Sequence, residues 1–160
     1  MQPARHPVAL RTQQLLRAAG VDSAVVEFEQ STRTSADAAA AIGCSVSEIA
    51  KSIVFRGAGS GDAIVVIACG HHRVDERKVA ALLHEPIARA DAEFVRVMTG
   101  YVIGGVAPIG HASPARLLLD QDLRRFALVW AAGGTPVSVF PIAPDDLQRV
   151  TGAPWCDVAA

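Results

Sequence analysis

The chain has 160 residues, of which 51% are hydrophobic and 19% are charged, and its formal net charge is −1. This composition favours one globular domain spanning residues 1–160 and excludes long disordered tracts. The near-zero charge excludes a protein that coats nucleic acid, because such binding rests on many Lys and Arg contacts. Contact with a single nucleic-acid end stays open.

The sequence carries no signal for a membrane or for an oxidising compartment. Apolar runs such as residues 63–69 are far shorter than the roughly 20 residues of a membrane helix, and residues 1–7 lack the apolar core of a signal peptide. Cys44, Cys69 and Cys156 form no C-x-x-C pair, so free thiols are expected. These features predict a cytoplasmic protein without membrane contact.

The first third of the chain alternates helices and short strands. A helical repeat covers residues 8–19 and ends at Gly20, and the β-rich residues 24–28 predict a strand. Thr34 followed by Asp37 resembles a capping box, which predicts a helix over Ser35–Ile42 closed by Gly43.

The same logic extends through the middle of the chain. Ser45 and Glu48 predict a second short helix, after which residues 52–55 form a strand. Residues 63–69 are apolar on both faces, so they predict a central strand joined to the previous one by a hairpin. Two further helices are expected, one capped by Asp75 and ending at Leu83, and one capped by Asp91 and ending at Met98.

The last third predicts three strands and a helix, over residues 116–120, 126–130, 137–140 and 145–150. Helices and strands follow no strict βαβ order. We therefore expect a mixed α+β fold within the α/β class. It consists of a curved, barrel-like mixed sheet surrounded by short helices.

The stretch from Thr99 to His111 contains four glycines and Pro108 within otherwise apolar sequence. Glycine allows close approach to the main chain, and proline fixes its own φ, so this composition predicts a shaped loop with exposed N–H groups. Such groups can hold a carboxylate, a phosphate or a developing oxyanion. The alternative is a tight connection between a strand and a loop.

Lys51 is the second candidate, because it interrupts an apolar passage at the start of a strand, where an ammonium needs a partner or a ligand. The alternative is a lysine that extends to solvent. No Ser or Cys stands beside a base as a nucleophile, and the histidines at 71, 72, 84 and 111 match no metal-ligand spacing. Neither a metal nor a cofactor is expected.

Four segments occur in a characteristic order: T-x-x-x-A-A from Thr34, E-x-x-K-S-I-V-F from Glu48, T-G-Y-x-x-G-G-x-x-P-x-G from Thr99, and A-A-G-G from Ala131. Over residues 8–152 the chain resembles the YbaK/ProXp family. Its members are aminoacyl-tRNA deacylases and also occur as an editing domain associated with prolyl-tRNA synthetase.

The resemblance implies hydrolysis of the ester of misacylated tRNA by water, with backbone stabilisation of the oxyanion and no cofactor. The implied catalytic residues are Lys51, Gly104, Gly105, Val106, Ala107 and Pro108. The implied substrate-binding residues are Phe28, Thr34, Tyr101, His111, Ala132 and Gly133. The implied partners are the acceptor end of misacylated tRNA and prolyl-tRNA synthetase or another synthetase.

The resemblance also implies a small amino acid, such as alanine or serine, on the proline tRNA. A subgroup that acts on cysteinyl-tRNA carries a tyrosine at the position of Phe28 and a serine at that of Ala132, so cysteine is not the expected amino acid. The alternative function is a non-catalytic module that binds an amino acid or a tRNA end and docks on a synthetase.

Overall fold

The computed structural model describes residues 1–30, 32 and 34–160. Five α-helices lie in this part of the chain: α1 (Pro7–Ala18), α2 (Ser35–Ile42), α3 (Glu76–Leu83), α4 (Ala92–Thr99) and α5 (Pro144–Thr151). Two 3₁₀ helices accompany them: η1 (Val46–Glu48) and η2 (Gln121–Arg125). The strands are β1 (Gln2–Pro3), β2 (Val26–Glu27), β3 (Ile49–Gly57), β4 (Ala63–Cys69), β5 (Ile87–Arg89), β6 (Ala115–Asp120), β7 (Val129–Ala132), β8 (Ser138–Ile142) and β9 (Trp155–Cys156).

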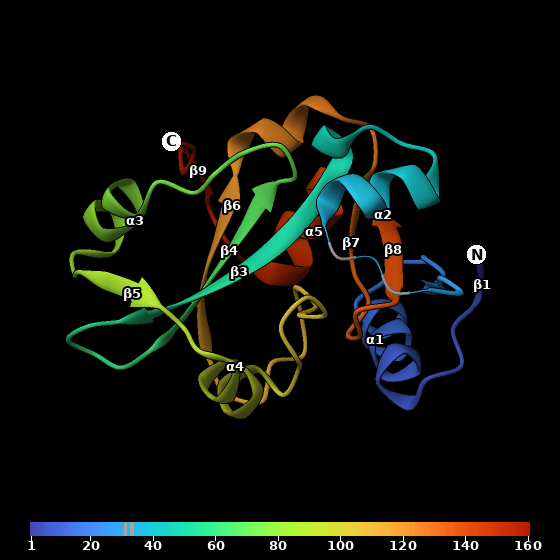
Figure 1. The fold of residues 1–160 in the computed structure, drawn as a ribbon, viewed down its shortest axis with the longest axis horizontal. Coiled ribbons are helices and arrows are strands. Elements are labelled where there is room, and N and C mark those ends of the chain that lie inside the picture. The colour runs from blue at the N-terminus through green and yellow to red at the C-terminus, as the bar shows by residue number, and fades with distance from the viewer. Residues whose placement is uncertain (31, 33) are drawn as a thin grey trace.

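The strands form one mixed sheet in the order β1-β2-β8-β7-β3-β4-β6-β9, with β5 paired to β3. β3 and β4 form the expected antiparallel hairpin, whereas β6 runs parallel to β4, and β7 runs parallel to β3. The mixed sheet with short helices around it is confirmed (Figure 1). The sheet does not close into a barrel, because the order ends at β1 on one side and β9 on the other.

β4 is buried over its whole length and divides the core. Its side chains alternate between the two faces of the sheet, as strand geometry requires. Val65 and Ile67 pack in the larger cluster, to which α1 contributes Leu16 and α5 contributes Leu147. Ile64, Val66 and Ala68 of β4 pack in a second cluster with α3. The prediction of a central strand that is apolar on both faces is therefore confirmed.

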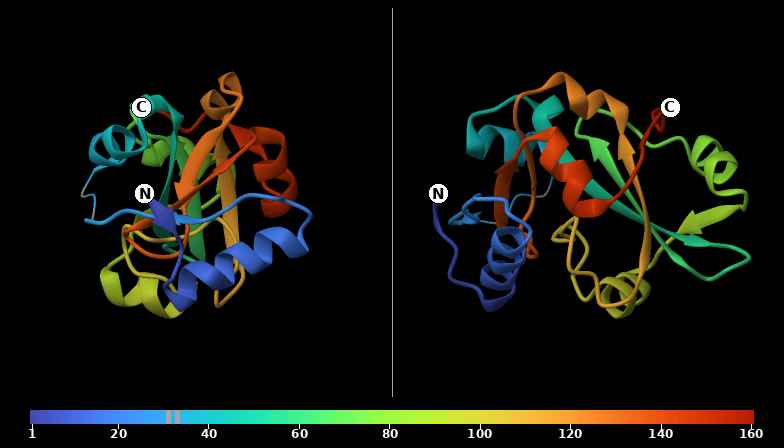
Figure 2. Two further views of the ribbon diagram at one scale, coloured as in Figure 1. Left: turned by 90° about the vertical axis from the view of Figure 1, so that its right-hand side faces the viewer. Right: turned by 180° about the vertical axis from the view of Figure 1, so that it is seen from behind.

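The helices cover different parts of the sheet. α5 lies against the face turned to the viewer in the right-hand view of Figure 2. α3 and β5 lie beside the hairpin end of β3 and β4, on the opposite side of the molecule from α1 (Figure 1). α2 packs over the start of β3, where Ala38 and Ala39 contact Ile49. α4 and the following loop form a small cluster of their own beside Val54.

The predicted helix boundaries rest on capping, and the structure confirms them. The Thr34 hydroxyl accepts a hydrogen bond from the Asp37 N–H at the start of α2, and Gly43 ends the helix in the left-handed region at φ 88°. Asp75 and Asp91 cap α3 and α4 in the same way. Because these signals lie within a few residues of each other, the sequence alone suffices to place them.

One predicted strand is displaced. Residues 126–130 were expected to be extended, but the strand β7 begins only at Val129. The preceding residues follow the 3₁₀ helix η2, whose first turn is capped by the Asp120 carboxylate accepting from the Asp122 N–H. This cap at the end of β6 starts a helical turn, so the chain reaches an extended conformation later than the apolar pattern suggests.

None of the helices in the described ranges combines the length and the apolar character that a membrane span requires. Cys44, Cys69 and Cys156 carry free thiols, as expected from their spacing.

Candidate active site

The sheet forks where β7 leaves β3. β7 pairs with β3 only at Ile49 and Ala50, and β5 joins the same edge of β3 from Phe55 on. The fork opens into a cavity of about 250 Å³. It is lined by residues of α2 and the segment before it, of β3, of the loop after α4, and of β7 and β8: Thr32, Thr34, Ser35, Ala38, Ile49, Ala50, Lys51, Ser52, Ile53, Gly104, Val106, Trp130, Ala131, Ala132, Pro136, Ser138 and Val139.

A second cavity of about 260 Å³ lies beside the first. Its lining is mostly apolar: Ser52, Ile53, Val54, Arg89, Ala90, Val95, Ile103, Gly104 and Val106. Ser52, Ile53, Gly104 and Val106 line both cavities. The loop that contains Gly104 therefore lies between two adjoining spaces.

This loop is shaped by its glycines. Gly104 has φ +86°, a conformation that L side chains rarely adopt, and Gly105 packs directly on another loop. A Cβ on Gly105 would lie 2.6 Å from the carbonyl carbon of Thr135, so only glycine permits this approach of two main chains. The prediction of a loop shaped by its backbone is confirmed.

The loop also has free hydrogen-bond donors. The Gly105 N–H donates to the Val102 carbonyl at 3.0 Å, whereas the N–H groups of Gly104, Val106 and Ala107 have no hydrogen-bond partner in the described part of the chain. Val106 and Ala107 are buried. Buried main-chain donors are nearly always paired, so these groups are suited to a ligand oxygen.

Two residues that were predicted to bind substrate, Tyr101 and His111, hydrogen-bond to the main chain of the loop. His111 Nε2 donates to the Ala107 carbonyl at 2.8 Å, and the Tyr101 hydroxyl donates to the Ile109 carbonyl at 2.7 Å. Burial lowers the pKa of His111, which favours the neutral ring in this contact. Neither side chain lines either cavity. Both hold the loop from behind.

Lys51 lies on β3 at the edge of the first cavity. Its Nζ donates to the carbonyls of His72 at 2.6 Å and Gly70 at 3.2 Å, in the turn that follows β4. Burial lowers the pKa of Lys51, and the proximity of Cys69 and Asp120 counteracts this effect. An ammonium has three N–H donors, so one remains for a ligand.

Some of the other predicted site residues line the first cavity, and the rest are buried next to it or elsewhere in the fold. Thr34 and Ala132 line the first cavity, whereas Phe28 and Gly133 are buried outside it. Gly105, Ala107 and Pro108 are buried beside the lining residues Gly104 and Val106. The structure thus brings together Lys51, the Gly104–Pro108 loop, Thr34 and Ala132.

The sequence reasoning missed Ser52, Trp130 and Ser138. Ser52 Oγ is buried and has no hydrogen-bond partner in the described part of the chain, although the residue lines both cavities. Its position next to Lys51 was the only available signal. Trp130 lies opposite Ile49 in the pairing of β7 with β3, a relation between segments about 80 residues apart that no local pattern contains.

The described lining of both cavities contains no His, Cys, Asp or Glu. The lining therefore offers hydroxyls, the Lys51 ammonium, the Arg89 guanidinium and free main-chain N–H groups, but no general base beside a nucleophile. This chemistry suits binding of an oxygen-rich ligand and stabilisation of negative charge on a carbonyl oxygen.

Comparisons with known proteins give a consistent result. A family model described as an aminoacyl-tRNA editing domain matches residues 29–150. An uncharacterized protein of Bacillus subtilis, YwhH, is 36% identical over 135 residues, which cover 84% of this chain and 85% of that protein.

Two crystal structures are similar over nearly the whole fold. One, described as a candidate trans-editing enzyme for prolyl-tRNA synthetase, is 41% identical with a TM-score of 0.92, covering 98% of this chain and 99% of the other. The second, the hypothetical protein APE2540, is 29% identical with a TM-score of 0.87, covering 94% and 99%.

Proposed function

The chain belongs to the aminoacyl-tRNA editing domain family, and on this basis we propose that it is a deacylase that hydrolyses the ester of misacylated tRNA. The observation that carries the proposal is the Gly104–Ala107 loop, which presents unpaired N–H groups between two cavities. These donors support this reaction class, because ester hydrolysis develops negative charge on the carbonyl oxygen.

In the proposed reaction, a water oxygen attacks the ester carbonyl carbon and the bond to the ribose oxygen breaks. The ribose oxygen takes a proton and leaves as a hydroxyl group, while the amino acid leaves as a carboxylic acid. The N–H groups of the loop stabilise the oxyanion of the tetrahedral intermediate. Each well-placed donor lowers the activation free energy by about 3 kcal/mol. Since no base lies in the described lining, the ribose hydroxyl of the substrate is a suitable group to orient the water.

The two cavities suit the two halves of the substrate. The first contains Lys51, several hydroxyl groups and the aromatic ring of Trp130, a combination that suits a nucleotide because bases stack on aromatic side chains and an ammonium pairs with phosphate. The second is mostly apolar and suits a small side chain, such as that of alanine or serine. An ester held against the loop directs its two ends into different cavities.

The nucleic-acid partner is the acceptor end of a tRNA. The similarity to the candidate trans-editing enzyme for prolyl-tRNA synthetase supports the proline tRNA as the carrier and a synthetase as a partner. The whole chain, residues 1–160, is proposed to act as one editing domain in the cytoplasm.

The decisive experiment is incubation of the purified chain with a panel of mischarged tRNAs, including alanyl and seryl forms of the proline tRNA. Time-dependent loss of the acyl group, with correctly charged prolyl-tRNA spared, is the expected result. Saturable binding without turnover of any substrate would instead establish the non-catalytic module and contradict the deacylase.

A further inference from the structure

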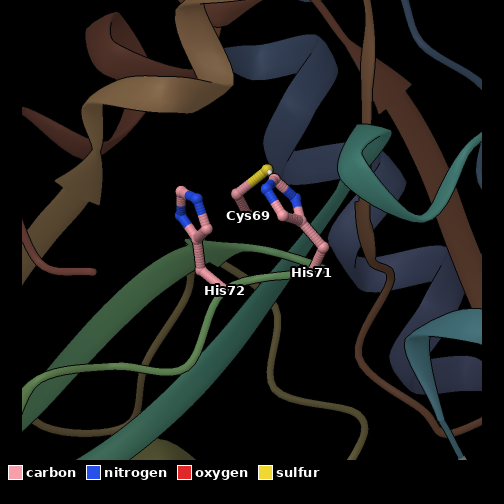
Figure 3. A group of neighbouring side chains, drawn as sticks. All are labelled: Cys69, His71 and His72. Carbon is pink, nitrogen blue, oxygen red and sulfur yellow. Dashed lines mark hydrogen bonds between the residues drawn. The ribbon is translucent and has the colours of Figure 1, made fainter. Parts of the chain in front are cut away.

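A group of metal-binding side chains lies at the end of β4, outside both cavities. One donor atom each from Cys69, His71 and His72 lies within 4.8 Å of the others. The Sγ of Cys69 and the Nδ1 of His71 are 3.3 Å apart. Figure 3 shows the sulfur of Cys69 next to the ring of His71, with the ring of His72 on the other side of the Cys69 side chain. His84 and His111, the other candidates from the sequence, do not belong to this group.

Both ring nitrogens of His72 face carboxylate oxygens. Its Nδ1 lies 2.7 Å from Asp120 Oδ2, and its Nε2 lies 3.1 Å from Asp122 Oδ2. A neutral imidazole has one N–H, so one of these contacts would set a nitrogen lone pair against a carboxylate oxygen. A second proton or a metal ion removes this mismatch.

Asp120 is built to orient this histidine. Its side chain is only 1% exposed, and it accepts hydrogen bonds from the N–H groups of Cys69 and Asp122. In the described chain no Lys or Arg forms an ion pair with Asp120 or Asp122. A buried carboxylate that fixes the ring of a ligating histidine is the usual second partner in zinc sites.

We propose that Cys69, His71 and His72 bind a Zn²⁺ ion, with the fourth position taken by water or by the neighbouring Asp122. A thiolate and two imidazoles are donors that zinc prefers, and tetrahedral ligands at about 2.0 and 2.3 Å from the ion lie about 3.5 Å from each other. The 3.3 Å separation of Cys69 Sγ and His71 Nδ1 is close to this value. Each of these two atoms also contacts Ser47 at 2.9 Å, and the ion would replace those contacts. The charges of a divalent ion, a thiolate, two carboxylates and the Lys51 ammonium cancel.

The site is connected to the first cavity through Lys51. The carbonyls of Gly70 and His72, which accept from Lys51 Nζ, belong to the turn that carries two of the three ligands. An ion held by residues 69, 71 and 72 therefore fixes the acceptors that position the ammonium. Only this effect on deacylation rests on the proposed function, whereas zinc binding does not.

The test uses the full chain, stripped of metal with a chelator. Zn²⁺ is titrated in competition with a chromogenic chelator, and Co²⁺ is added separately to detect thiolate-to-metal absorption in the near ultraviolet. One equivalent of Zn²⁺ per chain is expected. His71→Ala and Cys69→Ser should each weaken zinc binding at least tenfold, and Cys69→Ser should abolish the cobalt thiolate band.

The matched controls are Cys156→Ser and His84→Ala, which make the same chemical changes outside the group and should leave binding intact. His71 is exposed, so its variant keeps the test valid if Cys69→Ser does not fold. Substoichiometric zinc binding, or binding that survives His71→Ala, overturns the proposal. Zinc binding without deacylation of any tRNA contradicts only the proposed function, and deacylation without zinc binding contradicts only the metal site.

Discussion

Substitution of the loop glycines separates the catalytic role of the backbone from its structural role. A Cβ on Gly104 would meet nothing within 4 Å, so Gly104→Ala destabilises the fold only through its left-handed conformation, by about 1–2 kcal/mol. Relief of that strain should turn the N–H groups of the loop away from the ester carbonyl and lower activity as well. A Cβ on Gly105 would lie 2.6 Å from the Thr135 carbonyl carbon, where ordinary contacts begin near 3.4 Å. The loop must then retreat by about 1 Å, a displacement that can lower a rate about 10²-fold.

We therefore expect Gly105→Ala to lower kcat by about 10²–10³-fold, the loss typical of a missing oxyanion donor. The assay is single-turnover deacylation of mischarged tRNA, with thermal unfolding measured on the same samples. Gly61→Ala is the matched control for Gly104→Ala, because Gly61 also has a positive φ and open space around its Cβ but lies in the β3–β4 hairpin. The control should lose stability alone. Folded Gly104→Ala and Gly105→Ala proteins with full activity would refute the role of the loop.

Three further predictions concern other parts of the molecule. Lys51→Ala should lower deacylation at least tenfold, and Lys51→Arg should also be impaired because a planar fork does not replace a compact ammonium; parental turnover by the alanine variant would contradict this role. Binding of tRNA should weaken only slowly with added salt, corresponding to about one to three phosphate contacts, and a steep slope in a filter-binding titration would count against a grip on the acceptor end alone. The main-chain N–H groups of Arg5 and His6 donate to the Glu27 carboxylate and lower its pKa in the folded protein. The ionised Glu27 side chain therefore contributes its full stabilisation above the unfolded-state pKa, and this contribution is lost as the pH falls through the folded-state pKa. Glu27→Gln should therefore flatten the dependence of unfolding free energy on acidic pH, measured by urea titration, and an unchanged curve would refute this linkage.

The parts of the fold that the sequence predicts well are those set by neighbouring residues. The helix Ser35–Ile42 has the expected bounds because its cap at Thr34 and its end at Gly43 are local signals. The displaced start of β7 had no such local signal, since it depends on the turn that Asp120 caps. The sequence also had no local signal for whether the sheet closes, because closure is a property of strand pairing across the whole sheet, whose order here ends at β1 and β9.

The candidate site shows the same division. Lys51 and the Gly104–Pro108 loop were recognisable because a lone cation in an apolar strand and a cluster of glycines are visible in the sequence. Ser52 and Trp130 were not, because their roles come from the fork between β3 and β7, which depends on the pairing of Ile49 with Trp130. For His111 the sequence predicted the location beside the loop, but it contained no signal for the contact with the Ala107 carbonyl.

The ammonium of Lys51 has two roles, because it contacts the turn after β4 and also lies at the edge of the first cavity. Two of its three N–H donors hold the turn that carries His71 and His72, and one is left for a substrate oxygen. A substitution that keeps the charge but changes the geometry must therefore disturb either the turn or the substrate contact. Its Nζ is held by two carbonyl groups, and in the described part of the chain no carboxylate forms an ion pair with it. Under the proposed function, the remaining N–H donor of this ammonium is expected to contact a phosphate or a ribose oxygen at the end of a tRNA.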